Sequence, residues 1–225
     1  MEAKKGRREM KKFELTTESI TNALGKKLFR IKALVEFGDV KAGELGGYVE
    51  KEGNVSQDGN AWVCGNAAVS GNARVCGDAA VFGDARVFSG AKVSGNAWVS
   101  GNAWVSDNAA VSGNARVYSN AKTSGNAAVF GDARICGDAE VSGNARVSSN
   151  ADYTLVQGFG TKLRCTTFCR SKNKKIMVNC GCFHGDLEGF RKQVKETRSG
   201  KIAKEYLMIA DLMEYHFTSE DSSNE

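Results

Sequence analysis

Four cysteines near the C-terminus have the residue type and clustering that could hold a metal ion. They are Cys165, Cys169, Cys180 and Cys182, on both sides of a turn expected at 172–174. If the strands pair symmetrically about this turn, Cys165 lies opposite Cys180 and all four thiols share one face, which suggests zinc. However, CxxxC with CxC is not a zinc-knuckle spacing, and a flat sheet does not wrap tetrahedrally around an ion. We therefore interpret them as small apolar residues packed under helices, and we expect no cofactor.

The same predicted hairpin is basic, which could serve contacts with phosphates. Its cations lie within residues 162–175 and are Lys162, Arg164, Arg170, Lys172, Lys174 and Lys175. A solvated hairpin tip is the simpler interpretation. Binding of nucleic acid through Arg170, Lys172, Lys174 and Lys175 remains open as an alternative.

A six-residue repeat precedes this hairpin and must form the framework that positions the functional side chains. Residues 53–154 divide into seventeen consecutive hexads such as GNARVC and GDARVF. The third residue is Ala except at Val55, and the fifth is Val or Ile except at Gln57, Thr123 and Tyr153. Residues two apart on a strand share a face, and Gly-Asn or Gly-Asp tolerates a tight corner. The pattern predicts a mainly β protein, a parallel β-helix of about five to six coils with atypical end repeats.

The hexads resemble the hexapeptide-repeat family of left-handed β-helices, as in the run VSGNAR at 69–74. The resemblance implies a left-handed helix and association into trimers through the flat sides. Many members of this family are acyltransferases that use CoA thioesters, and others are carbonic anhydrases. The segment FGDVKAGELGGYVE, directly before the repeats, is similar to uncharacterised hexapeptide proteins of phages and prophages. That similarity implies a host protein or nucleic-acid complex as the target, and an anti-defence role.

The repeats lack the groups that an acyltransferase site requires. Such enzymes need a histidine general base, but the seventeen hexads contain no histidine and, read in one phase, no extruded loop. The two histidines, His184 and His216, both lie in the C-terminal segment. Only His184, reaching the coil of a neighbouring subunit, would supply a base. We expect a non-enzymatic binding or scaffold protein, with a CoA-dependent acyltransferase as the alternative.

Aromatic and basic residues occupy the outward positions of the repeat. Stacking hexads three apart gives one ladder of Trp62, Ala80, Trp98, Arg116 and Arg134, and a second of Ala68, Arg86, Trp104, Lys122 and Glu140. Exposed tryptophan is a liability, so we expect burial by flanking segments or by homo-oligomerisation, with a trimer favoured. The same side chains could instead bind a partner surface or a nucleic-acid strand.

The flanking segments divide into modules. We expect a disordered extension at 1–10, a β cap over the open edge of the helix at 11–52, and a disordered tail at 218–225. Residues 155–217 show a hairpin pattern and then helical periodicity, which predicts a small ββαα module. The residues expected to face inward from its helices are Leu187, Phe190, Val194, Ile202, Tyr206, Ile209 and Met213.

Composition argues against several other classes. No apolar run is long enough to span a bilayer and no secretory signal is recognisable, so we expect no membrane association. Seven cysteines without such a signal indicate reduced thiols in the cytoplasm. The net charge of +5 is too small to indicate nucleic-acid binding by itself.

Overall fold

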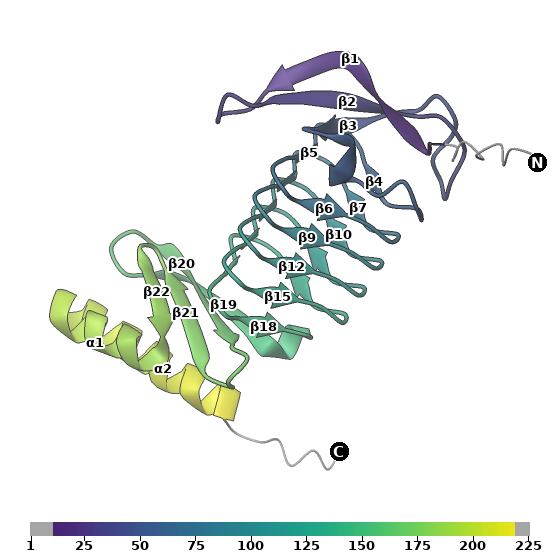
Figure 1. Cartoon of the computed structure of the whole chain (residues 1–225). Helices are drawn as coiled ribbons and strands as arrows, with labels where there is room; N and C mark the ends of the chain where they lie inside the picture. Colours follow the sequence, from purple (N-terminus) through teal and green to yellow (C-terminus); the bar gives the residue numbers. More distant parts are fainter. Residues whose placement is uncertain (1–10, 219–225) are drawn as a thin grey trace, which may run out of the picture.

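The computed structural model describes residues 11–218, which form a β-helical prism with a module at each end (Figure 1). An antiparallel cap covers the N-terminal end, and a sheet with two helices covers the other. The extension predicted at 1–10 and the tail from 219 onward lie outside the described residues. Thr218, predicted to begin the tail, instead ends the last helix. No helix within residues 11–218 is long and apolar enough to cross a membrane.

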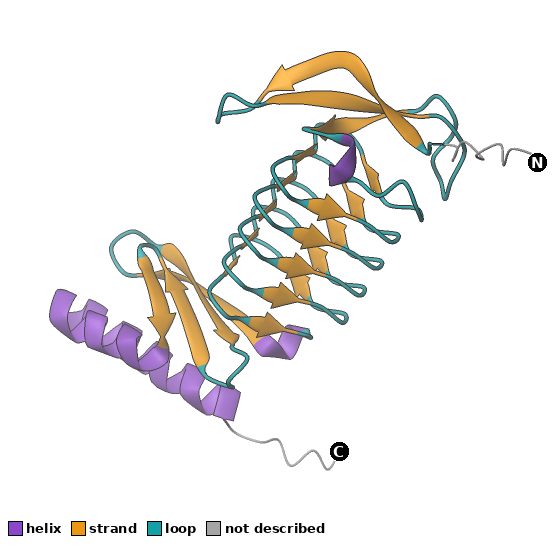
Figure 2. Cartoon of the chain, viewed as in Figure 1, coloured by secondary structure: helices purple, strands orange, loops and turns teal. Residues whose placement is uncertain are grey.

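The prism consists of fifteen two-residue strands that pair in parallel into three sheets (Figure 2). We name these sheets the Trp98 face (β4, β7, β10, β13, β16), the Trp104 face (β5, β8, β11, β14, β17) and the third face (β6, β9, β12, β15, β18). The strands are Trp62–Val63 (β4), Ala68–Val69 (β5), Arg74–Val75 (β6), Ala80–Val81 (β7), Arg86–Val87 (β8), Lys92–Val93 (β9), Trp98–Val99 (β10), Trp104–Val105 (β11), Ala110–Val111 (β12), Arg116–Val117 (β13), Lys122–Thr123 (β14), Ala128–Val129 (β15), Arg134–Ile135 (β16), Glu140–Val141 (β17) and Arg146–Val147 (β18). The predicted parallel β-helix is confirmed, as is the stacking of both ladders.

The core of the prism is narrow because each hexad contributes only two inward side chains. From Ala61 to Val147, the third-position Ala and fifth-position Val or Ile residues are essentially fully buried. Each corner requires a residue with positive φ, which is usually glycine, as at Gly101 with φ +64°. A Cβ added to Gly101 would lie 2.9 Å from the backbone N of Ser119, so successive coils stack too closely for a side chain there.

The N-terminal cap extends one sheet of the prism. Strands β1 (Phe13–Thr21) and β2 (Lys27–Ala33) are antiparallel, and β2 pairs with β3 (Leu45–Val49). Strand β3 then runs parallel to β5, with Tyr48 beside Ala68. The β cap expected at the open edge of the helix is therefore present, and its Phe13 side chain joins the prism core.

The coil register differs from the sequence prediction at the first hexad. Val55, assigned to a third position, bridges the fifth-position residue Val75 and is buried. Gln57 therefore belongs to a corner that is two residues longer than the others. Its Oε1 accepts hydrogen bonds from the backbone N of Lys12 at 2.7 Å and of Phe13 at 3.3 Å. The prediction that all seventeen hexads share one phase is therefore wrong at the first hexad. Residues 53–55 (GNV) resemble the GNA of later repeats in sequence, but the longer corner after them shifts the register by two residues.

The C-terminal module is larger than the predicted ββαα unit. Four antiparallel strands precede two helices, and two short 3-10 helices, Glu52–Asn54 and Asn150–Asp152, flank the coils. The elements are β19 (Tyr153–Phe159), β20 (Arg164–Arg170), β21 (Ile176–Cys180), β22 (Phe183–Asp186), α1 (Leu187–Thr197) and α2 (Gly200–Thr218). The last predicted hexad is not a coil, because β19 begins at Tyr153 and pairs with β20.

The C-terminal sheet packs against the prism with one face and against the helices with the other. Cys169 and Met177 contact the prism core, whereas Phe168 and Val178 form a second core with the helices. The residues predicted to face inward from the helices are buried in this second core, except that Ile202 is only partly buried.

Candidate functional sites

The three tryptophans of the ladders differ in their surroundings. Trp62 is 5% exposed, because Phe13 and Phe37 of the cap cover it with ring centroids 6.2 and 5.3 Å away. Its indole N–H is buried and has no hydrogen-bond partner within residues 11–218. Trp98 and Trp104 remain 43% and 41% exposed. A flanking segment therefore buries the first tryptophan but leaves the other two at the surface.

Each of the two exposed indoles contacts an arginine and a phenylalanine. Arg116 lies 4.5 Å from the ring centroid of Trp98, and Phe82 meets the same ring edge-on at 5.9 Å. Trp104 has Arg86 at 5.5 Å and Phe88 at 6.1 Å, and both come from the preceding coil. These contacts fix both indoles in place, on neighbouring faces of the same coil.

An apolar groove lies beside Trp104. It is bounded by the Trp104 face and the overhanging turn between β1 and β2, and it encloses about 410 Å³. Ile20 and Leu24 line it from the cap and are 39% and 75% exposed. The cap therefore extends the hydrophobic surface around Trp104, which sequence analysis did not anticipate.

The remaining predicted ladder residues lie toward the C-terminal end of the prism. The Lys122 ammonium group pairs with the Glu140 carboxylate at 2.9 Å on the Trp104 face. Arg134 lies on the Trp98 face, and its backbone O accepts a hydrogen bond from the Tyr153 hydroxyl at 2.6 Å. Its guanidinium makes no ion pair within residues 11–218, so this end of the Trp98 face is basic.

The four hairpin cations that were predicted to act together differ in their surroundings. Arg170 pairs with Asp152 at 3.6 Å and lies 5.5 Å from the Phe217 ring, so it joins the sheet to α2. Lys172, Lys174 and Lys175 lie in the turn between β20 and β21. Arg170 is therefore engaged by Asp152 and Phe217, whereas the three lysines lie in the turn itself.

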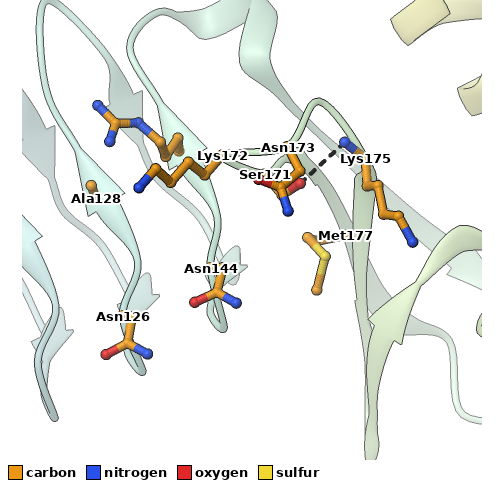
Figure 3. Close-up of a pocket in the computed structure, with 9 residues that line it drawn as sticks. Asn126, Ala128, Asn144, Ser171, Lys172, Asn173, Lys175 and Met177 are labelled. Atoms are coloured by element: carbon orange, nitrogen blue, oxygen red, sulfur yellow. Dashed lines mark hydrogen bonds between the residues drawn. The ribbon is translucent and has the colours of Figure 1, made fainter.

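Lys172 and Lys175 instead line a groove between the hairpin and the last coils of the prism (Figure 3). We call it the hairpin groove. It has a volume of about 560 Å³ and is lined by Asn126, Ala128, Asn144, Arg146, Ser171, Lys172, Asn173, Lys175 and Met177. Arg146 was not predicted as a site residue, because it belongs to the coils and only the docking of the hairpin brings Lys172 close to it.

The predicted single face of four cysteines is wrong. Thr166, not Cys165, pairs with Cys180, which is a shift of one residue, and such a shift moves a side chain to the opposite face of a sheet. Cys169 therefore faces the prism core, whereas Cys180 packs against the helix core. Among residues 11–218, no group of His, Cys, Asp and Glu is arranged to hold a metal ion.

His184 lies in the C-terminal sheet and contacts residues of its own chain. Its Nδ1 lies 2.7 Å from Asn179 Oδ1. Asn179 in turn donates from Nδ2 to the backbone O of Glu140 at 2.7 Å, which joins the sheet to the prism. His184 also lines a cavity of about 330 Å³ with Cys180 and Cys182. The contact of His184 with Asn179 is structural, because Asn179 joins the sheet to the prism. The described coils contain no histidine that could act as a general base in its place.

Comparison with known proteins agrees with this architecture. A family model described as the YdcK beta solenoid repeat matches residues 91–107, which span β9 to β11 and contain both exposed tryptophans. None of the curated proteins compared matches the chain. The repeat, the three parallel sheets and the family match together identify the chain as a β-solenoid repeat protein.

Proposed function

We propose that the chain is a non-enzymatic binding scaffold that assembles as a homotrimer through its Trp98 and Trp104 faces. The observation that carries this proposal is the pair of indoles, 43% and 41% exposed, on neighbouring faces of one coil. Large apolar side chains that cluster at a surface commonly mark an interface. Because neighbouring side chains already restrict both rings, covering them costs little side-chain entropy.

Cyclic symmetry accounts for the placement of the indoles on two different faces. A two-fold dimer joins a patch to its own copy, whereas a closed ring joins two different patches. Rotation about an axis parallel to the prism keeps every residue at its own height. The Trp98 face of one copy then meets the Trp104 face of the next, and Trp98 enters the apolar groove beside Trp104.

The charges along the two faces support this pairing. In the same register, Arg134 of one copy lies opposite Glu140 of the next, which is a favourable pair. Arg116 lies opposite Lys122, where the Glu140 carboxylate, 2.9 Å from Lys122, offsets the repulsion. The third face takes no part in the contact and remains open to a ligand.

Molar mass in solution tests the proposal directly. Light scattering should give a trimer for the wild-type protein and a monomer for Trp98→Ser and for Trp104→Ser. Met208→Ser is the matched control, because Met208 is 61% exposed on α2 and belongs to neither face. A wild-type monomer would overturn the proposal, and so would a trimer that both tryptophan variants retain.

Nucleic-acid binding through the hairpin tip is a second candidate function. The observation that favours it is that the Lys172 and Lys174 ammonium groups meet no carboxylate within residues 11–218, and the resemblance to phage and prophage proteins adds a host nucleic-acid complex or host protein as the proposed target. A mobility shift that weakens with salt and is lost in the Lys172→Glu, Lys174→Glu variant would support it. The absence of a shift at low salt would rule it out.

A further inference from the structure

The hairpin groove contains positive charge that the protein does not neutralise. Arg146, Lys172 and Lys175 line it, and none of its nine lining residues is acidic. Lys175 has Asp186 at 3.4 Å, whereas Arg146 and Lys172 have no carboxylate partner within residues 11–218. Arg146 is instead held 4.9 Å from the centroid of the Phe130 ring, which positions the guanidinium and leaves its charge intact.

The asparagines beside the groove are also distinctive. The corner residues of successive coils stack into three columns. In the two columns away from the groove, the asparagine side chains donate hydrogen bonds from coil to coil and end on the carboxylates of Asp132 and Asp138. In the column that borders the groove, Asn108 donates to Asn126 at 3.3 Å and the next residue is Asn144. The Asn144 side chain makes no hydrogen bond within residues 11–218. The groove is therefore lined by the neutral amide of Asn144, at the coil position where the other two columns carry a carboxylate.

The groove is preformed by contacts between the hairpin and the last coil. The backbone N of Lys172 donates to the backbone O of Asn144 at 3.2 Å, and Ser171 bridges Ala145. The backbone N of Lys175 donates to the Ser171 hydroxyl at 3.1 Å, which closes the turn. Figure 3 shows the Lys172 side chain extending toward the prism, with the asparagines on successive coils below it. A ligand would meet these groups without reordering the backbone.

From this arrangement we infer that the hairpin groove binds a small phosphate-bearing molecule of about mononucleotide size. A guanidinium matches two phosphate oxygens at once, and a lysine adds a mobile point charge. The Asn126 and Asn144 amides supply neutral donors, and Met177 supplies an apolar contact for the rest of the ligand. The volume of about 560 Å³ lies within the usual range for small-molecule sites. The site lies beside the third face, so the inference does not depend on the proposed trimer.

Isothermal titration calorimetry of the full chain with ADP at low ionic strength tests this inference. Adenosine, which lacks the phosphates, is the control ligand. ADP should bind and adenosine should not. Arg146→Gln and Lys172→Gln should each weaken ADP binding by about tenfold or more, because each removes a charge-assisted hydrogen bond. Lys174→Gln is the matched control, because it removes an equal charge from the same turn but does not line the groove. Unchanged melting temperatures would show that all variants fold.

Three outcomes would overturn the inference. The first is that neither ADP nor pyrophosphate binds the wild-type protein. The second is that Lys174→Gln weakens ADP binding as much as Lys172→Gln, which would reveal only a diffuse attraction to a basic turn. The third is that a short single-stranded oligonucleotide binds and ADP does not, which would assign the charge to nucleic acid and support the second candidate function instead.

Discussion

The Arg116 guanidinium lies 4.5 Å from the centroid of the Trp98 ring, although a full coil separates the two residues along the chain. An exposed contact of this kind contributes about 0.5–1 kcal/mol. We expect Arg116→Ala to lower the free energy of unfolding by that amount, measured with urea at one fixed protein concentration because association adds to stability. Arg74 is an exposed strand residue of the third face with no aromatic ring beside its guanidinium among the described residues, so Arg74→Ala should lower the free energy of unfolding by less. Equal losses would mean that the contact contributes nothing.

The corner at Ser119 should be improved by glycine. Ser119 has a φ of +62° where most corners use Gly, and a residue with a side chain is strained there by about 1–2 kcal/mol. Glycine also gives the unfolded chain more freedom, so we expect Ser119→Gly to stabilise the protein by only about 0.5–1 kcal/mol. Gly101→Ala, at the neighbouring coil of the same column, should destabilise it. Thermal unfolding of both variants checks the pair, and destabilisation by Ser119→Gly would contradict the strain argument.

The prism could be predicted in detail because its physics is local and repeated. Each Ala and Val pair points inward at a fixed spacing, so the core, the strand positions and the stacking of Trp98 with Arg116 follow from counting alone. The two helices were also predictable, since Leu187, Phe190 and Val194 repeat at helical spacing. These features depend on neighbours within a few residues or on a strict period.

The features that sequence analysis missed depend on contacts between modules or on one-residue shifts. The extra residues of the first corner, including Gln57, serve the cap, and no property of the repeat indicates them. The cysteine prediction was wrong because it placed Cys165 opposite Cys180, whereas strands that pair symmetrically about a turn at 172–174 place Thr166 there, as the structure shows. The hairpin groove could not be predicted, because Arg146 and Lys172 meet only after the C-terminal sheet docks.

Lys12 gives the cap a dependence on pH. Its ammonium group is buried and donates to the backbone O of Gly59 at 3.1 Å and of Ala61 at 2.9 Å, and burial lowers its pKa from 10.5 to about 8. Below pH 8 the folded and unfolded states both carry the proton, so the penalty for burying the charge is fully present. Between about pH 8 and pH 10.5 the unfolded state binds a proton that the folded state lacks, so stability rises with pH.

Replacing Lys12 isolates this contribution from other groups that titrate in the same range. The free energy of unfolding of the wild-type protein minus that of Lys12→Met should increase from pH 8 to pH 10.5. Lys11→Met is the control, because Lys11 is exposed and pairs with Glu52 at the surface, and its difference from wild type should not show this rise. A wild-type minus Lys12→Met difference that stays constant would mean that Lys12 titrates alike in the folded and unfolded states.

The placement of the cysteines on two faces predicts which thiols react. Cys169 is fully buried, and burial raises its pKa to about 12; burial likewise raises the pKa of Cys165 to about 11. Because the thiolate is the reactive form, neither should be labelled rapidly by a disulfide reagent at neutral pH. Cys182 is exposed, so Cys182→Ser should remove the fastest phase of labelling. Cys169→Ser should leave labelling of the native protein unchanged and reduce the total by one thiol only after unfolding. Rapid labelling of Cys169 in the native protein would contradict the one-residue register that turns it toward the prism.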